Sequence, residues 1–319
     1  MDAPRASVFF GELLVDIVLA GDGRATYHAG GAPANAAVAA TRAAPGETGR
    51  ALLVAAVGSD PAGDWLMASL TAAGVDVTCV EVVAGHRTSL ALTADVGATN
   101  ERFWFYRDAD ILISPRLVAA VPELIGCLTY GSLSTCDPDS QLVDALESLK
   151  LRTRRARRPI LLDLNYRASL WPSPLEFGHR MRPEVAGSTV VKANRREAAL
   201  VVGGEDDDCG DLAHRLLALG PELVIVTDGP KGLVAVAEGV RVSKLSADPC
   251  GPASESIGTG DAITGHVARW LATCDVVDLS APGLDAILSP AMGAARRVAA
   301  QTGSGWSLPH FPTESRVSE

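Results

Sequence analysis

Short apolar runs alternate with longer amphipathic segments along most of the chain. Apolar runs of about four to eight residues, bounded by glycine or polar residues, are typical of strands that are buried on both faces. Strands that alternate with helices favour a mainly parallel sheet with helices on both sides, the three-layer αβα sandwich of the α/β class. The runs that predict these strands are 7–10, 51–58, 128–133, 159–163, 189–194 and 224–227.

Two stretches, about 12–31 and 85–107, do not follow this alternation. Each contains extended segments, and a polar turn at 95–100 divides the second, so we expect them to form a small separate sheet within a single domain that spans 1–319. The second stretch includes four consecutive aromatic residues, Phe103 to Tyr106, followed by Arg107. These side chains either pack within the small sheet or line a pocket for a polar ligand.

Polar residues recur where the predicted strands of the main sheet end. They are Asp163, Asn165, Asn194, Thr227 and Asp228. Each of them alone is a loop residue by default. In open α/β sheets, however, ligands bind beyond the carboxyl ends of the strands. The shared position of these residues therefore predicts a ligand site at that edge.

The segment Gly258-Thr259-Gly260-Asp261 precedes a predicted helix that runs from Ala262 to about Cys274. Its glycines allow a tight turn whose N–H groups converge, and the helix start adds unpaired N–H groups and partial positive charge. Together these features predict an anion site. Asp261 is placed to act as a base beside that anion, or it is only a helix cap.

A second glycine-rich segment, Gly30-Gly31-Ala32-Pro33-Ala34-Asn35, also opens a predicted helix. Asn35 either caps this helix or presents its amide to a ligand. Asp16 stands in apolar surroundings and is either an outward-facing strand residue or an acceptor for a ligand hydroxyl. The glycine spacing differs from the dinucleotide fingerprint, which argues against a Rossmann cofactor site.

Composition narrows the classes of partner. The chain has 319 residues, 47% of them hydrophobic, and a formal net charge of −10. This balance argues against nucleic acid as the main partner, and we interpret the basic cluster 152–158 as a solvated loop. Six cysteines without a CxxC pair, no secretory signal and no apolar run of about 18 residues predict a cytoplasmic protein with reduced thiols and no membrane contact.

Seven segments in chain order resemble the ribokinase-like carbohydrate kinases, also called the phosphofructokinase-B family, and most closely its fructokinases. Asn194–Glu197 is similar to the family's N-x-x-E motif, Thr227–Gly232 to its T-x-G-x-x-G loop, and Gly258–Asp261 to its G-x-G-D signature. The remaining four segments are Gly11–Asp16, Gly30–Asn35, Phe105–Arg107 and Asp163–Arg167. The resemblance implies a ribokinase-like fold in which the small sheet is a lid.

The resemblance also implies a reaction, in which the γ-phosphoryl group of ATP passes to a sugar hydroxyl, most plausibly of fructose. Asp261 would be the general base, with Gly258, Thr259 and Gly260 forming the anion hole. Mg²⁺ would accompany ATP near Asn194 and Glu197, mostly through water. The implied sugar ligands are Asp16, Gly30, Gly31, Asn35, Tyr106, Arg107, Asn165, Arg167 and Asp261. The implied ATP ligands are Lys192, Asn194, Thr227, Gly229, Gly232, Gly258 and Gly260.

Several alternatives stay open at this point. A 2-keto-3-deoxygluconate kinase would use Arg107 and Arg167 to bind a carboxylate, although the carboxylate of Asp16 would oppose that substrate. A nucleoside kinase and a catalytically silent sugar-binding protein are further alternatives. Glu255-Ser256-Ile257 departs from the family pattern before the anion hole, which leaves a monovalent-cation site in question. Pairing of lids between subunits would give a homodimer.

Overall fold

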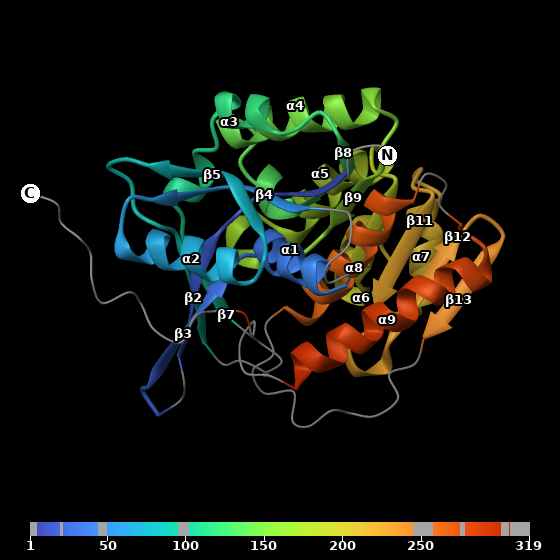
Figure 1. The fold of residues 1–319 in the computed structure, drawn as a ribbon. Helices are drawn as coiled ribbons and strands as arrows, with labels where there is room; N and C mark the ends of the chain where they lie inside the picture. The colour runs from blue at the N-terminus through green and yellow to red at the C-terminus, as the bar shows by residue number, and fades with distance from the viewer. Residues whose placement is uncertain are drawn as a thin grey trace, which may run out of the picture.

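The computed structural model describes residues 5–19, 22–43, 50–94, 102–244, 258–274, 278–300 and 306. The three residues 255–257 that depart from the family pattern lie outside these ranges. The described part of the chain forms two β-sheets, one much larger than the other (Figure 1).

The larger sheet has nine strands in the order β13-β12-β11-β10-β9-β8-β1-β4-β5. Apart from the edge strand β5, its parallel strands are built from the apolar runs that the sequence pattern identified, because their side chains are buried on both faces. Only β12 and β13 run antiparallel to their neighbours, and the sequence pattern did not predict them. The bounds are β1 Ala6–Phe10, β4 Ala51–Gly58, β5 Asp76–Val83, β8 Ile125–Gly131, β9 Ile160–Asp163, β10 Val190–Asn194, β11 Leu223–Thr227, β12 Leu233–Ala237 and β13 Val240–Lys244.

Helices cover both faces of this sheet, as the α/β pattern predicts (Figure 1). One face packs against α1 (Ala32–Ala43), α2 (Pro61–Ala72), α8 (Thr259–Thr273) and α9 (Ala281–Ala299). The other packs against α3 (Pro115–Ala120), α4 (Gln141–Arg155), α5 (Pro174–Ala186), α6 (Arg195–Val202) and α7 (Cys209–Leu217). The expected three-layer sandwich is therefore confirmed.

Helices α1 and α8 approach each other closely, and a glycine makes this possible. A Cβ atom on Gly265 would lie 2.2 Å from the carbonyl oxygen of Ala36 and 2.7 Å from the Cβ of Ala39. Small residues on both helices allow the two backbones to approach closely, because there are no large side chains between them. The contact matters for the site because α1 carries Asn35 and α8 carries Asp261.

The smaller sheet, which we call the lid, has four strands in the order β3-β2-β6-β7. It extends from the main body at the lower left of Figure 1, where β2, β3 and β7 are labelled. Its strands come from the two stretches that the sequence pattern set apart. Their bounds are β2 Leu14–Leu19, β3 Ala25–Gly30, β6 Leu90–Ala94 and β7 Arg102–Tyr106.

The two faces of the lid differ in chemistry. Cross-strand partners share a face, and the register aligns Tyr27, Ile17, Leu92 and Trp104 in one row across all four strands. Asp16 lies on the opposite face of the lid, in a row with His28, Ala91 and Phe105. Phe103, two residues before Phe105 on β7, is on the same face.

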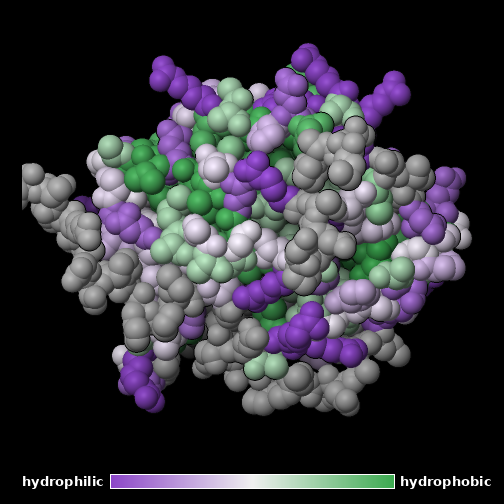
Figure 2. Space-filling model, viewed as in Figure 1, coloured by the Kyte–Doolittle hydropathy of each residue, from purple (hydrophilic) through white to green (hydrophobic). Residues whose placement is uncertain are grey.

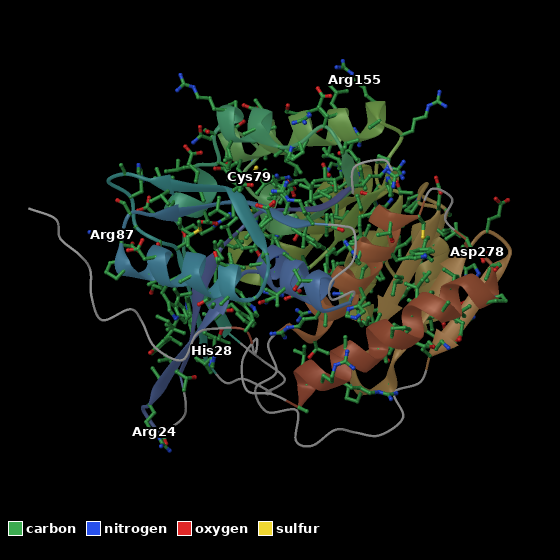
Figure 3. All side chains as sticks on the ribbon, viewed as in Figure 1. Arg24, His28, Cys79, Arg87, Arg155 and Asp278 are labelled. Atoms are coloured by element: carbon green, nitrogen blue, oxygen red, sulfur yellow. The ribbon has the colours of Figure 1, made fainter. Side chains whose placement is uncertain are left out.

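We call the row that holds Trp104, with its neighbours of the same parity, the outer lid face. Part of this face, at Val15 and Ala29, is buried in the core of the main body, and the Tyr27 ring lies 5.6 Å from that of Trp65 on α2. By contrast, the tip of the β2–β3 hairpin, where Arg24 lies, is hydrophilic (Figures 2 and 3).

The basic cluster 152–158 is not the solvated loop that the sequence suggested. Helix α4 extends to Arg155, so most of the cluster lies in or beside its last turn, where positive charge suits the helix dipole. Arg152 donates to the carbonyls of Val118 and Val121, and Arg158 donates to carbonyls at the end of α8. Arg155, in contrast, projects away from the helix (Figure 3).

Within the described residues, none of the helices is both long enough and apolar enough to cross a lipid bilayer.

Candidate active site

Helix α8 begins at Thr259, three residues earlier than the glycine pattern suggested. Gly258 is the N-cap and takes a left-handed conformation with φ of 92°, which favours glycine. Thr259, Gly260 and Asp261 therefore form the first helical turn, where backbone N–H groups lack partners within the helix. The anion hole is consequently the helix end itself, and Asp261 stands on its rim.

The pKa of the Asp261 carboxyl group is raised towards neutral pH. This pKa is raised to about 6, chiefly by burial and next by the neighbouring carboxylate of Asp163. The ammonium of Lys192, the amide of Asn35 and the guanidinium of Arg167 act in the opposite direction. Asn35 Nδ2 donates to Asp261 Oδ2 over 2.8 Å. A carboxylate with this pKa accepts a proton more readily than an exposed aspartate does.

A buried ion pair lies behind the start of α8. Lys192 Nζ is 3.1 Å from each carboxylate oxygen of Asp163, and Thr264 Oγ1 donates to Asp163 Oδ2 over 2.7 Å. Burial disfavours the charged form of Lys192, but the carboxylates of Asp163, Glu197 and Asp261 outweigh it and raise the pKa of the ammonium. A Cβ on Gly260 would lie 2.6 Å from Lys192 Nζ. The glycine thus lets a fixed positive charge stand directly behind the anion hole.

Asp163, at the end of β9, is one partner of this pair. The sequence pattern placed it among the polar residues at the strand ends but gave it no role in binding sugar or ATP. The signal was available, because Asp163 ends a buried strand and is followed by Asn165 and Arg167. What the sequence could not show is that a lysine of the next strand, which pairs in register with Asp163, would neutralise it.

On the lid side, Asp16 is buried against Gly30 of the neighbouring strand. A Cβ on Gly30 would lie 2.0 Å from Asp16 Oδ2. Burial raises the pKa of Asp16 to about 7; Arg167 lowers it, whereas Asp261 and Glu12 raise it. Asp16 and Asp261 therefore lie close enough to influence each other, with the guanidinium of Arg167 near both.

The segment after β9 supplies this arginine. Asn165 has φ of 36°, an uncommon conformation for a residue with a side chain, and its side chain is buried. Backbone strain of this kind is often found where the fold holds a ligand-binding residue in place. The guanidinium of Arg167 lies 5.0 Å from the centre of the Phe103 ring, which fixes it against the lid by a cation–π contact.

Two of the expected sugar ligands are placed elsewhere. Tyr106 is 62% exposed on the outer lid face, opposite to Asp16, because it pairs with Leu90, which in turn pairs with Val15. Arg107 Nε donates to Asp110 Oδ2 over 2.7 Å, and Nη1 donates to the carbonyl of Leu133. The structure therefore brings neither side chain to Asp16. The residues of β7 on the Asp16 face are Phe103 and Phe105 instead.

Asn194 and Glu197 form a capping box at the start of α6. Asn194 Oδ1 accepts the N–H of Glu197, and Glu197 Oε2 accepts the N–H of Asn194 over 2.8 Å. Glu197 Oε1 also accepts the N–H of Tyr166 over 2.9 Å. Burial raises the pKa of Glu197, opposed by Lys192. Because both carboxylate oxygens already accept hydrogen bonds, this pair suits a hydrated cation held through water better than a directly bound one.

The expected nucleotide loop follows β11. Thr227 pairs in register with Asn194, so the two residues end neighbouring strands at the same edge. Gly229, with φ of 51°, opens a short 3-10 helix at Gly229–Lys231, and Gly232, with φ of 105°, follows it. Lys231 is held by Asp228 over 2.9 Å. The backbone thus makes a narrow turn beside Asn194, as a phosphate-binding loop requires.

One residue of the site could not have been found in the sequence. Trp306 lies beyond α9, and its Nε1 donates to Asn35 Oδ1 over 2.7 Å. Both partners are buried. A single tryptophan in a polar C-terminal segment carries no motif, and the bond joins residues 271 positions apart in the chain.

These features form an anion hole at a helix end, a poised carboxylate beside it, and a lid that brings a second carboxylate opposite. Residues 6–309 match the family described as pfkB family carbohydrate kinase. The chain belongs to the pfkB family of carbohydrate kinases. The resemblance seen in the seven segments is confirmed by this match.

Relatives of this pfkB carbohydrate kinase include fructokinases. It is 31% identical to a fructokinase of Klebsiella pneumoniae over 291 residues, which cover 89% of this chain and 90% of that protein. A fructokinase from Xylella fastidiosa, solved with bound ATP, has a TM-score of 0.78 and 25% identity, covering 94% of this chain and 93% of that one.

A fructokinase double mutant from Vibrio cholerae O395, solved with fructose, ADP and potassium ion, also has a TM-score of 0.78, at 22% identity. The match covers 97% of this chain and 96% of that one. At this identity the likeness establishes the fold alone. It agrees with the expected ribokinase-like sandwich with a lid.

Proposed function

We propose that this carbohydrate kinase is an ATP-dependent fructokinase, which transfers the γ-phosphoryl group of ATP to a primary hydroxyl of fructose. The observation that carries the proposal is the meeting of Asp16 and Asp261, from the lid and from α8, around the guanidinium of Arg167. Two carboxylates and an amide suit a neutral polyol, whose hydroxyls donate to them. The fructokinases among the relatives support fructose as that sugar.

In this reaction Asp261 accepts the proton of the attacking hydroxyl. The hydroxyl oxygen forms a bond to the γ-phosphorus, the bond from that phosphorus to the β–γ bridging oxygen breaks, and ADP leaves with the electron pair. The N–H groups at the start of α8, with Lys192 behind Gly260, stabilise the charge on the transferred phosphoryl group. Closing the lid over the sugar excludes water, which would otherwise be a competing nucleophile.

Mg²⁺ is the expected companion of ATP, and it would neutralise charge on the phosphate oxygens. Asn194 and Glu197 would hold its water shell, since their own oxygens are committed to the capping box.

We also propose that the protein is a cytoplasmic homodimer that pairs through its lids. Four large apolar side chains of the lid are about 40% exposed or more, namely Leu19, Tyr27, Trp104 and Tyr106. Apolar side chains gathered on one sheet face favour association. ATP and reduced thiols are both features of the cytoplasm, which suits a kinase with free cysteines at the described positions.

The proposal is tested by incubating the protein with MgATP and, in turn, fructose, 2-keto-3-deoxygluconate, ribose and nucleosides, while ADP release is measured. We expect the highest kcat/KM with fructose. Preference for the keto acid would replace fructokinase by the alternative kinase. Absence of ADP release with every compound would instead favour a silent sugar-binding protein.

The role of Asp261 is tested by the isosteric substitution Asp261→Asn. We expect kcat to fall by about 10²- to 10⁴-fold, the usual contribution of a general base. Fructose binding by calorimetry should persist, because the amide keeps the shape of the carboxyl group. Asp144→Asn, at an exposed position on α4, is the matched control and should leave kcat unchanged. Full turnover by the Asp261 variant would exclude this residue as the base.

A further inference from the structure

Three side chains from distant parts of the chain form a hydrogen-bonded series that ends at the catalytic carboxylate. Trp306 Nε1 donates to Asn35 Oδ1 over 2.7 Å, and Asn35 Nδ2 donates to Asp261 Oδ2 over 2.8 Å. Trp306 and Asn35 are each 7% exposed, so both side chains are buried. Asn35 stands on α1, Asp261 on α8, and Trp306 beyond the end of α9.

The chemistry of the three groups fixes the direction of this series. An indole nitrogen carries a hydrogen and only donates, so the group of Asn35 that faces Trp306 has to be the carbonyl oxygen. The amide nitrogen must then face Asp261, whose ionised carboxylate only accepts. Without the indole, the two orientations of an asparagine amide differ little in shape. Trp306 therefore determines which end of the Asn35 amide meets the base.

A cavity beside the series shows that packing alone does not hold the amide. It measures about 260 Å³ and lies between α1, α8 and α9, with Asn35, Gly258 and Trp306 in its wall. A space of this size admits water molecules, which can satisfy either end of an amide. The orientation of Asn35 thus depends on the hydrogen bond from Trp306.

We propose that Trp306 is a positioning residue for phosphoryl transfer, which keeps the donor end of the Asn35 amide on the carboxylate of Asp261. This inference rests on the proposed kinase function and deepens it by adding a residue from the far end of the chain. Asn35 has a second N–H, so the same orientation leaves a donor for a sugar hydroxyl. Trp306 itself touches neither substrate nor phosphate in this scheme.

The charged groups around Asp261 set the expected pH dependence. Asp163 on β9 and Asp16 on the lid oppose its ionised form, whereas Lys192 on β10 and Arg167 favour it. The cavity wall adds three basic side chains, Arg42, His266 and Arg297. A reversed Asn35 amide would point its carbonyl oxygen at the carboxylate and raise the pKa of Asp261. The ionised base is needed for turnover, so activity would then be lost at a higher pH as pH falls.

The substitution Trp306→Phe tests this by keeping an aromatic ring and removing the indole N–H. We expect the acid limb of the kcat/KM profile, near pH 6 in the wild type, to move up by on the order of one unit. The loss in kcat/KM should be about tenfold below pH 6 and small at pH 8. Asp16 also titrates, with a pKa of about 7, but it does so in both proteins and cancels in the comparison.

Trp171→Phe is the matched control. Trp171 is also buried, but its Nε1 has no hydrogen-bond partner among the described residues, so the substitution removes an N–H that positions nothing. Its pH profile should coincide with that of the wild type. An unchanged acid limb in the Trp306 variant, or an equal shift in both variants, would overturn the proposal.

A second measurement does not depend on turnover. The Trp306 indole N–H resonance, assigned by its loss in the Trp306 variant, should shift with pH in the wild type and follow the titration of Asp261. The shift should vanish in Asp261→Asn. If the wild type phosphorylates no sugar, the proposed function fails while this titration still tests the series. A Trp306 resonance that is insensitive to Asp261 would overturn the proposal in either case.

Discussion

Gly30 shows how a single missing side chain shapes the sugar site. The carboxylate of Asp16 fills the space that a side chain on Gly30 would need. A Cβ atom there would lie only 2.0 Å from Asp16 Oδ2 and would collide with it. Gly30→Ala should displace this carboxylate and raise KM for fructose by about 10- to 100-fold, the worth of a hydrogen bond to a charged group. KM for ATP should not change, because Gly30 belongs to the lid, whereas the expected nucleotide loop follows β11 of the main sheet.

The control for this substitution is Gly23→Ala, in the same hairpin. A Cβ there would meet nothing within 4 Å, although φ of 84° makes the residue mildly strained. Steady-state kinetics of the two variants separate loss of the site from general strain in the hairpin. Equal KM values in Gly30→Ala and the wild type would mean that Asp16 does not bind the sugar.

Individual residues were predictable from the sequence when their chemistry was tied to a local motif. Asp261 follows two glycines at a helix start, and Asp16 is a lone carboxylate in an apolar strand. Tyr106 was assigned to the sugar site although strand alternation puts it on the face opposite to Asp16. Trp306 was beyond reach, because its role depends only on a partner far away in the chain.

At the scale of elements, the contact between α1 and α8 keeps the proposed base Asp261 within hydrogen-bonding distance of Asn35. Gly265→Ala would place a Cβ 2.2 Å from the carbonyl oxygen of Ala36 and force the helices apart. We expect the free energy of unfolding to fall by about 1–3 kcal/mol, as in other overpacked interfaces. Activity should also fall, because Asn35 and Asp261 would separate.

Gly293→Ala provides the opposite case within α9. Its nearest neighbour would be the Arg297 guanidinium at 3.6 Å, an ordinary contact with a flexible group. Alanine at this interior helix position should raise the free energy of unfolding by about 0.5–1 kcal/mol. Urea denaturation of both variants measures the two changes. A Gly265 variant as stable as the wild type would show that the helices do not need this close approach.

The elements themselves followed from apolar runs, but their ends did not. Helix α8 starts at Thr259 because glycine and threonine join its first turn once the backbone is stabilised by packing, although both have weak helix propensity. The hairpin β12–β13 went unassigned even though Gly239 lies in a two-residue turn between the apolar run 233–237 and the alternating segment 240–244. Local preference is a poor guide wherever tertiary contacts decide the boundary.

At the scale of the whole molecule, the outer lid face determines the expected assembly. Trp104 is 40% exposed there, beside Tyr106 at 62%. Trp104→Lys should convert the proposed dimer into a monomer, because a buried charge without a partner is costly at an interface. Light scattering after gel filtration measures the mass. The rate of fructose turnover by the Trp104→Lys variant would show whether dimerisation also contributes to the function of the lid.

Leu175→Lys is the matched control, since Leu175 is 83% exposed on α5, which is not part of the lid sheet. Its mass should equal that of the wild type. A monomeric wild type would contradict the proposed assembly, and so would a Trp104 variant that stays dimeric.

The alternation of β7 also limits how this sequence can vary. Phe103 and Phe105 face the Asp16 side while Trp104 and Tyr106 face outwards, so a single inserted residue within the strand would exchange the two sets. The sugar side would receive Trp104 and Tyr106, and the outer face would receive Phe103, which contacts Arg167. Natural or engineered length changes inside β7 should therefore be accepted only in steps of two residues.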